Sequence, residues 1–331
     1  PNGNILMIAW ERFYSSDWSA MGRTSVNNSL SQMWATAILE IEPNLENNSY
    51  EIVWEWHLWD HLVQDIGSSY DATYGTISDH PELMDINCSS VGSSGGPGGL
   101  PNADWMHVNA ISYNEEFDQI VLSSRHMDEI YVIDHSTTTE EAATHSGGNY
   151  GKGGDFLYRW GNPQNYGRGN NTNHILADQH SINWIPDNSP GEGNFILFNN
   201  FHSNNSSAAL EFTPSVNADG SYTVPENEPF GPDSYTWIHT GGFQSEAQGG
   251  AFRLPNGNTL ITEATSSYIF EIDQNGQTVW DYDYPSNMSM IPRAQKYGYN
   301  YFDSNSLLGD VNEDDIINVL DVIIIVNIIL G

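Results

Sequence analysis

The sequence has few basic residues. Nine Lys and Arg residues stand against 43 Asp and Glu residues, which gives a formal net charge of −34. A chain of this sign repels nucleic acid and anionic membrane lipids, so we expect neither as a partner. Such acidity also favours solubility in a salty external medium, where ions screen charge repulsion within about 10 Å. We therefore expect a secreted, periplasmic or cell-surface protein.

Cysteine and long apolar runs are also scarce. The single cysteine, Cys88, excludes an internal disulfide, so stability must come from packing, with or without bound metal ions. Cys88 stands in the sequence CSSV, which is not the C-x-P-x-R context of formylglycine sulfatases. No apolar run reaches the roughly 18 residues that a bilayer-spanning helix needs, and no signal peptide is visible. We expect no membrane span.

Glycine, proline and aromatic residues are plentiful instead. The chain has 30 Gly, 15 Pro and 11 Trp residues, and strand-like runs are joined by turn residues along most of its length. No long amphipathic helix pattern occurs before residue 310. Many short strands joined by turns are typical of the all-β class, which we predict here.

A repeated order of turns and strands runs through the sequence. A turn such as PNGN feeds an apolar strand, a second strand ends in an acidic turn, and a third strand carries Trp. The turns lie at 1–4, 192–194 and 255–258, the second strands at 37–43, 130–134, 209–214 and 269–273, and the Trp strands at 52–56, 156–160, 235–239 and 278–282. Such a unit predicts β-propeller blades. Four visible blades are few for a closed ring, so we expect either unrecognised blades or N-terminal blades missing from this sequence.

A long insertion, residues 57–103, separates the first two blades. His57 and His61 are four residues apart with Asp60 between them. On a helix both imidazoles would share one face and could bind a metal. Packing against the neighbouring tryptophans is the alternative interpretation.

A cluster of polar side chains is predicted at the start of the second blade. Three strand-like runs form an antiparallel meander there, at 107–113, 119–124 and 129–133. His107 and Asn109 alternate onto one face of the first run, and Arg125 ends the second run. If these two strands pair, an imidazole, an amide and a guanidinium converge. Such a trio suits an anionic, oxygen-rich group.

A second histidine stands at a similar place in the next blade. His180 opens the third blade as His107 opens the second, and Gln248 opens the fourth. The innermost strands of a propeller line its central channel, so His107, Asn109, Arg125 and His180 can share one funnel. Either histidine alone could be a hydrogen-bonded structural residue. Two of them at matching positions, with Arg and Asn beside them, predict a functional site.

At these residues the sequence resembles the bacterial arylsulfate sulfotransferase family. The likeness covers nearly all of residues 1–300, in DWMHVNAI, IVLSSR, IYVIDHSTTTEEAA, GKGGDFLYRWGNPQNYGRG, DQHSINWI, PGEGNFILFNN and RLPNGNTLI. The resemblance implies a six-bladed propeller that transfers a sulfuryl group from an aryl sulfate ester to a phenol. It implies that His180 is the nucleophile, forming a sulfohistidine, and that His107, Asn109 and Arg125 hold the sulfuryl oxygens. Ser181 follows His180, where many relatives have Asp.

No organic cofactor is expected for this reaction. The sequence has no phosphate-cradling loop for a nucleotide sulfate donor. Two other functions stay open: a catalytically silent extracellular propeller used for adhesion or assembly, and a glycan-binding module that stacks sugars on its tryptophans.

The sequence changes character near its C-terminus, and we predict a propeller domain at 1–302 followed by a separate segment at 303–331. Positions 1, 3, 5, 7, 9 and 12 of a calcium loop are filled by Asp310, Asn312, Asp314, Ile316, Asn318 and Asp321. Asp315 stands at the usual glycine position, and Asp321 replaces the usual Glu. The apolar run VLDVIIIVNIIL follows. The segment resembles a single type I dockerin repeat, which implies a structural Ca²⁺ ion and a protein partner; the oligomeric state is not predicted.

Overall fold

The computed structural model describes residues 2–44, 46–92, 100–203, 206–285 and 290–298. Regular structure in these residues is nearly all β, which confirms the predicted class. None of their helices is both long and apolar enough to cross a membrane. The chain divides into two compact units, Pro1–Ala294 and Gln295–Gly331. The predicted boundary at residue 302 and the calcium loop at 310–321 lie outside the described residues.

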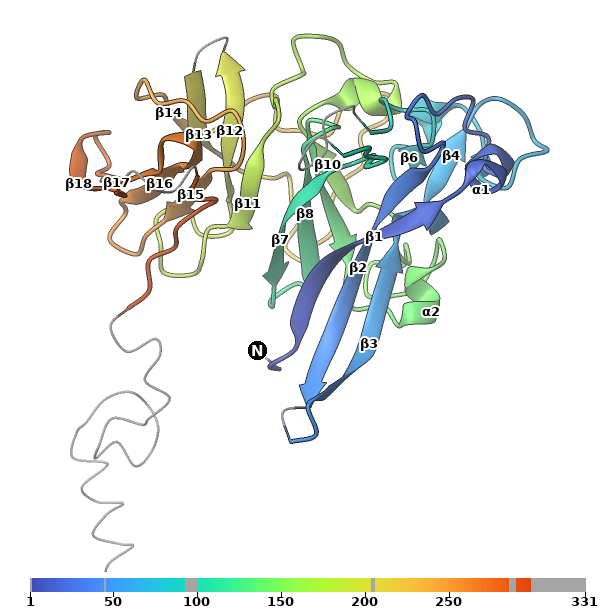
Figure 1. The fold of residues 1–331 in the computed structure, drawn as a ribbon, viewed down its shortest axis with the longest axis horizontal. Helices are drawn as coiled ribbons and strands as arrows, with labels where there is room; N and C mark the ends of the chain where they lie inside the picture. Colours follow the sequence, from blue (N-terminus) through green and yellow to red (C-terminus); the bar gives the residue numbers. More distant parts are fainter. Residues whose placement is uncertain (1, 45, 93–99, 204–205, 286–289, 299–331) are drawn as a thin grey trace, which may run out of the picture. The chain divides into compact units, whose positions relative to one another are not determined.

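Four antiparallel sheets follow one another along the first unit (Figure 1). The first contains β1 (Ile5–Phe13), β2 (Met33–Asn44) and β3 (Ser49–His57). The second contains β7 (Val108–Asn114), β8 (Gln119–Ser124), β9 (Glu129–Asp134) and β10 (Tyr158–Trp160). The third contains β11 (His180–Trp184), β12 (Phe195–Ser203), β13 (Ser206–Phe212) and β14 (Trp237–His239). The fourth contains β15 (Gly250–Arg253), β16 (Thr259–Glu263), β17 (Tyr268–Ile272) and β18 (Thr278–Asp283).

Short elements fill the connections. Helix α1 (Ser15–Ala20) follows β1, and helix α2 (Thr139–Ala142) follows β9. The insertion after β3 contains a small parallel sheet of β4 (Leu62–Gln64), β5 (Thr73–Tyr74) and β6 (Met84–Asp85). Single 3₁₀ turns are η1 (Leu58–Asp60), η2 (Ile77–Asp79), η4 (Pro163–Tyr166) and η5 (Ala264–Ser266).

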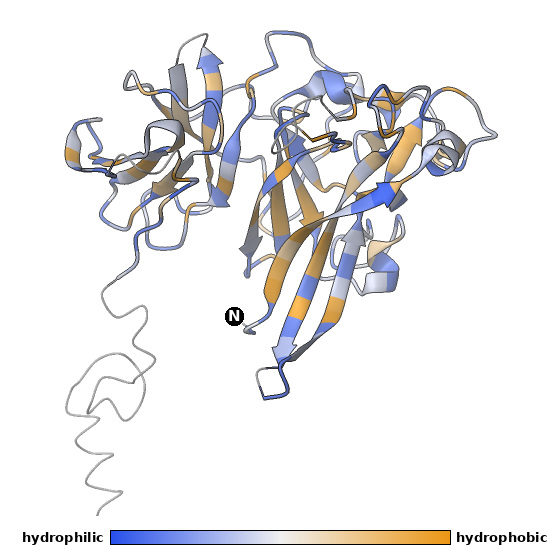
Figure 2. Cartoon of the chain, in the orientation of Figure 1, coloured by the Kyte–Doolittle hydropathy of each residue, from blue (hydrophilic) through white to orange (hydrophobic). Residues whose placement is uncertain are grey.

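Successive sheets pack face to face, which gives a propeller-like arrangement. In β8, Ile120 and Leu122 enter the core shared with the first sheet, whereas Val121 enters the core shared with the third. In β12, Leu197 faces the second sheet and Phe198 faces the fourth. Period-two alternation therefore supplies two different cores from one strand. Figure 2 shows apolar stretches along strands such as β1 and β2. The six-blade count stays a prediction.

The turn and second-strand repeat of the sequence corresponds to a repeated contact. In three sheets, the last Asn of the turn donates its side-chain N–H to a Glu in the second strand after that turn. The pairs are Asn4 to Glu40 at 2.6 Å, Asn194 to Glu211 at 2.5 Å and Asn258 to Glu271 at 2.6 Å. By this contact, β1, β12 and β16 are equivalent strands. The carboxylate thereby holds the turn against the neighbouring strand.

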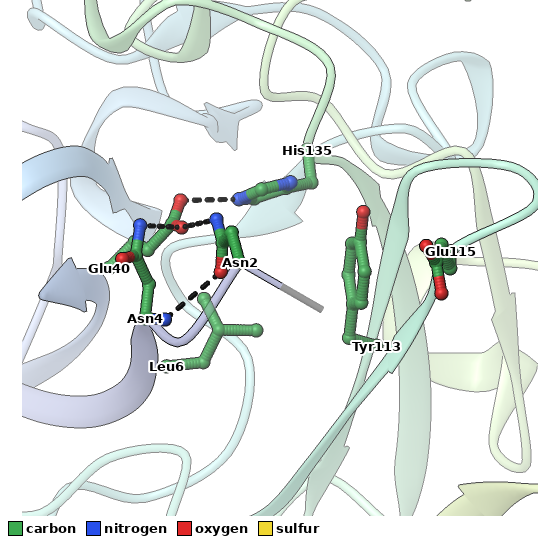
Figure 3. Close-up of a pocket in the computed structure, with 7 residues that line it drawn as sticks. All are labelled: Asn2, Asn4, Leu6, Glu40, Tyr113, Glu115 and His135. Carbon is green, nitrogen blue, oxygen red and sulfur yellow. Dashed lines mark hydrogen bonds and ion pairs between the residues drawn. The ribbon is translucent and has the colours of Figure 1, made fainter. Parts of the chain in front are cut away.

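Two of these glutamates also bind the next sheet. Glu40 Oε2 lies 3.0 Å from His135 Nε2, and Glu211 Oε2 lies 2.6 Å from Arg253 Nη2. Figure 3 shows the first of these junctions, at a cavity of about 270 Å³ lined by Asn2, Asn4, Leu6, Glu40, Tyr113, Glu115 and His135. Burial alone would raise the pKa of Glu40, but hydrogen bonds from Asn2, Asn4 and His135 lower it. The polar groups Asn2, Asn4, Glu40 and His135 of the lining are therefore hydrogen-bonded to one another, and we interpret this cavity as an inter-sheet junction.

Four of the nine basic residues are arginines buried inside the protein: Arg23, Arg159, Arg168 and Arg253. Three of them bind the backbone of the insertion. The carbonyl oxygens that accept their hydrogen bonds belong to Ser78, Pro81, Leu83, Ile86, Cys88 and Ser89. The insertion has little regular structure, so its buried carbonyls need donors from elsewhere. Arginine, with five N–H donors, can satisfy several at once.

Candidate functional site

The first strands of three sheets begin with the same unusual backbone conformation. His107, Ser181 and Gln248 have φ of 51°, 60° and 60° and lie at the starts of β7, β11 and β15. A positive φ in a non-glycine residue is uncommon and is often found at functional sites. By this criterion His107 corresponds to Ser181, and His180 stands one residue earlier. His107 and His180 thus occupy positions one residue apart in corresponding turns of the second and third sheets.

His180 is held in one tautomer. Its Nδ1 lies 2.8 Å from Asn200 Oδ1 and 2.9 Å from the carbonyl oxygen of Asp178. Asn200 is oriented by its own Nδ2, which donates to the carbonyls of Ser245 and Gln248 at 2.9 and 2.7 Å. Both neighbours of Nδ1 are acceptors, so Nδ1 carries the proton and Nε2 keeps a free lone pair.

The surroundings keep His180 neutral. Its side chain is 5% exposed. Burial, with smaller contributions from the positive charge of Arg125 and from His107, lowers the pKa of His180 to about 4, although its bond to Asn200 acts in the opposite direction. An unprotonated imidazole at neutral pH is a competent nucleophile.

His107 is fixed by a buried carboxylate. Asp104, which is 1% exposed, accepts from the His107 backbone N–H at 3.0 Å and lies 2.5 Å from His107 Nδ1 through its other oxygen. The His126 ring lies beside that of His107, with 4.9 Å between centroids. Burial, ahead of the repulsion from His107, lowers the pKa of His126. Asp104, His107 and His126 stand close enough to share a cation, but Asp104 already orients His107.

Arg125 and Asn109 connect this side of the site to the His180 segment. Arg125 donates from Nε and Nη2 to one oxygen of Asp178, at 3.0 and 2.6 Å, and its backbone N–H donates to the His107 carbonyl at 3.1 Å. Asn109 donates to the carbonyl of Gln179 at 2.7 Å. The structure therefore brings all four predicted residues into one network.

Four residues of this network were not predicted from the sequence: Asp104, Asp178, Gln179 and Asn200. Gln179 is fully buried and donates to Ser123, Ser124 and Glu129, which fixes the His180 segment to the second sheet. The DQH segment contains Asp178 and Gln179 but does not show their partners. Asn200 lies twenty residues from His180 and ends the stretch PGEGNFILFNN, which does not indicate its contact with His180.

The lowered pKa of His180 predicts how stability depends on pH. In the unfolded chain the pKa of His180 is about 6.5, so the imidazole binds a proton below that pH. In the folded chain the same imidazole binds a proton only near pH 4. The stability that this lowered pKa provides is therefore fully present above pH 6.5 and is lost as the pH falls towards 4. We expect His180 to contribute about 2 kcal/mol to the loss between pH 7.5 and 4.5.

Urea unfolding of the wild type and of His180→Gln at both pH values measures this contribution. The variant should lose correspondingly less stability on acidification. Equal losses in both proteins would contradict a buried neutral His180.

The sequence matches the family model described as Arylsulfotransferase (ASST) over residues 1–224. The match spans more than half of the chain and includes His107, Asn109, Arg125 and His180. A search of curated proteins finds no match. With the match and the His180 network together, the chain belongs to the arylsulfotransferase (ASST) family and has, in general terms, an arylsulfate sulfotransferase type of function.

Proposed function

We propose that the chain moves a sulfuryl group from an aryl sulfate ester to a phenol through a covalent intermediate on His180. The observation that carries the proposal is the tautomer of His180. Its Nδ1 proton is held by Asn200 and Asp178, so the neutral Nε2 is the nucleophilic atom. Within the described residues Nε2 has no hydrogen-bond partner.

The reaction would proceed in two displacements. The Nε2 lone pair attacks sulfur, the bond between sulfur and the aryl oxygen breaks, and phenolate leaves with the bonding electrons. The acceptor phenol then attacks the same sulfur, the N–S bond breaks towards Nε2, and the phenol proton passes to solvent. A phenolate is a good leaving group, so the first step does not require a strong general acid.

Arg125, Asn109 and His107 would stabilise the sulfuryl oxygens. Arg125 uses Nε and Nη2 on Asp178, which leaves the Nη1 hydrogens without a partner among the described residues. Asn109 donates one Nδ2 hydrogen to the carbonyl oxygen of Gln179, and its second Nδ2 hydrogen is available to a substrate oxygen. Donors already in place before charge develops cost no reorganisation during the reaction.

The other properties implied by the resemblance belong to the same proposal. We propose catalysis without a nucleotide sulfate donor, supported by the absence of a phosphate-cradling loop in the sequence. The acidic composition supports a secreted, periplasmic or cell-surface location. Carboxylate spacing supports Ca²⁺ binding by the loop from Asp310 to Asp321, with a protein partner for the segment that contains it.

Turnover of a chromogenic aryl sulfate tests the function. The full chain should release phenol when a phenol acceptor is added, and without acceptor it should gain the mass of one sulfuryl group. Arg125→Ala and Asn109→Ala should each slow transfer by roughly 10²- to 10³-fold, the usual effect of losing one oxyanion donor. Arg12→Ala, which removes a guanidinium from β1 outside the site, is the control.

Failure of the wild type to release phenol and to gain the adduct would refute the proposal. A propeller used for adhesion or glycan binding would then account better for the fold.

A further inference from the structure

A second group of metal-type ligands lies outside the candidate site. His61 follows the turn η1, His145 follows α2, and Asp155 precedes β10. The Nδ1 atoms of His61 and His145 lie 2.8 and 2.7 Å from the same oxygen, Oδ1 of Asp155. All three ligand atoms are within 4.8 Å of one another. Three separate segments thus place two imidazole nitrogens and one carboxylate at a single point.

This group differs from the pair predicted from the sequence. Residues 58–60 form a 3₁₀ turn rather than a longer helix, so His57 and His61 do not share a face. His57 ends β3, with Nδ1 2.9 Å from Glu11 and Nε2 3.1 Å from Glu55. His61 turns the other way, towards Asp155. The structure therefore does not support a His57–His61 metal pair, whereas His61 stacks on the Trp56 ring, as the packing interpretation expected.

The second nitrogen of His61 determines which atom can bind a metal. Nε2 lies 2.8 Å from the carbonyl oxygen of Ala142, so Nε2 carries a proton and donates it. Nδ1 is then left as the ligand atom. A backbone carbonyl on the remote nitrogen is the usual arrangement of metal-bound histidine. Gly154 permits the close approach, because a Cβ there would lie 2.5 Å from Nε2.

Two imidazoles of this group converge on one carboxylate oxygen. Both nitrogens of His61 face oxygen acceptors, and the ring is fully buried. A divalent cation at the point where the three ligand atoms meet would bind both Nδ1 atoms and the Asp155 oxygen directly.

One side of the group is open. The His145 side chain is 51% exposed, whereas His61 and Asp155 are buried. His145 also lines a cavity of about 270 Å³ together with Met21, Trp59, Asp60, Leu62, Asp71, Ala72 and Thr73. A cation held by three protein ligands would keep its fourth position towards this cavity for water or a small ligand.

We propose that His61, His145 and Asp155 bind one divalent transition metal ion, and that the ion is Zn²⁺. Two imidazoles and one carboxylate form a common donor set for four-coordinate zinc. Bonds of 2.0–2.1 Å to zinc place neighbouring ligand atoms about 3.3 Å apart, so the nitrogens and Asp155 need to separate by only about half an ångström. The ion would join the insertion, the loop after α2 and the segment before β10.

Zinc binding by the full chain tests the proposal. The protein is stripped with a chelator and then titrated with Zn²⁺ in excess Ca²⁺, so that the oxygen-rich C-terminal loop does not compete. We expect one equivalent bound, a rise in Tm of about 5 °C at a hundredfold excess over Kd, and a tetrahedral visible spectrum with Co²⁺.

His145→Gln and Asp155→Asn should each lose the bound equivalent and the rise in Tm. His145→Gln is the decisive variant, because a half-exposed side chain can change without loss of the fold, as its metal-free Tm would show. His80→Gln, which alters a partly exposed histidine paired with Glu82, should bind zinc as the wild type does. Stoichiometric zinc in His145→Gln, or none in the wild type, would overturn the assignment. These readouts do not depend on sulfuryl transfer.

Discussion

Replacing His180 with alanine is expected to reduce turnover by roughly 10⁴- to 10⁶-fold, the scale associated with losing a covalent nucleophile. The sulfuryl adduct should disappear with the activity, since Nε2 is the atom to which the group would be attached. The variant keeps Arg125, Asn109 and His107, so donor binding should weaken far less than turnover. Aryl sulfate turnover measures the loss of activity, and intact mass after a single addition of donor measures the loss of the adduct.

The control for this variant is His202→Ala, which removes an imidazole from β12 outside the network. A second variant, Asn200→Leu, tests the tautomer, because the Nδ1 proton loses its side-chain acceptor while Nε2 remains. It should retain the adduct but form it more slowly. Normal turnover in His180→Ala would show that another group accepts the sulfuryl.

Replacing Arg159 with methionine is expected to destabilise the fold by about 3–5 kcal/mol, the usual effect of breaking a buried ion pair. Arg159 and Glu129 are both fully buried, and two N–H groups meet the two carboxylate oxygens at 3.0 and 2.6 Å. Burial alone would lower the pKa of Arg159, but the carboxylate outweighs it and raises the pKa. Methionine would fill much of the volume and leave Glu129 without its counter-charge.

Urea unfolding at pH 7.5 measures this loss. In the double variant Arg159→Met/Glu129→Gln no charge remains, and the amide oxygen can still accept from Tyr131 and Asn165. About half of the lost stability should return. Arg12→Met is the exposed control. A loss below about 1 kcal/mol in Arg159→Met would show that the pair contributes little.

The strands could be predicted because their signals are local. The runs at 107–113, 119–124 and 129–133 correspond closely to β7, β8 and β9. Alternation of apolar residues marks a strand whatever it packs against. The strands with Trp were also found where expected, although 156–160 and 235–239 each contribute only their last three residues, to β10 and β14.

The site could be predicted only in part. Pairing of β7 with β8 was enough to bring His107, Asn109 and Arg125 towards one end of the sheet. The one-residue offset between His107 and His180 depends on a positive φ at Ser181, which a serine in the sequence does not indicate. Long-range contacts were equally hidden. Asp155 is 94 residues from His61, so only the fold brings the two together.

The placement of the arginines affects how fast a substrate can reach the protein. Four of the nine basic residues are enclosed, which leaves few cations on the surface to offset 43 acidic residues. An aryl sulfate ester is an anion, so at low ionic strength the protein repels its own proposed donor during diffusion. Salt shortens the range of that repulsion to about 10 Å at 0.1 M. Association should therefore accelerate with added salt, opposite to enzymes that attract their substrates by charge.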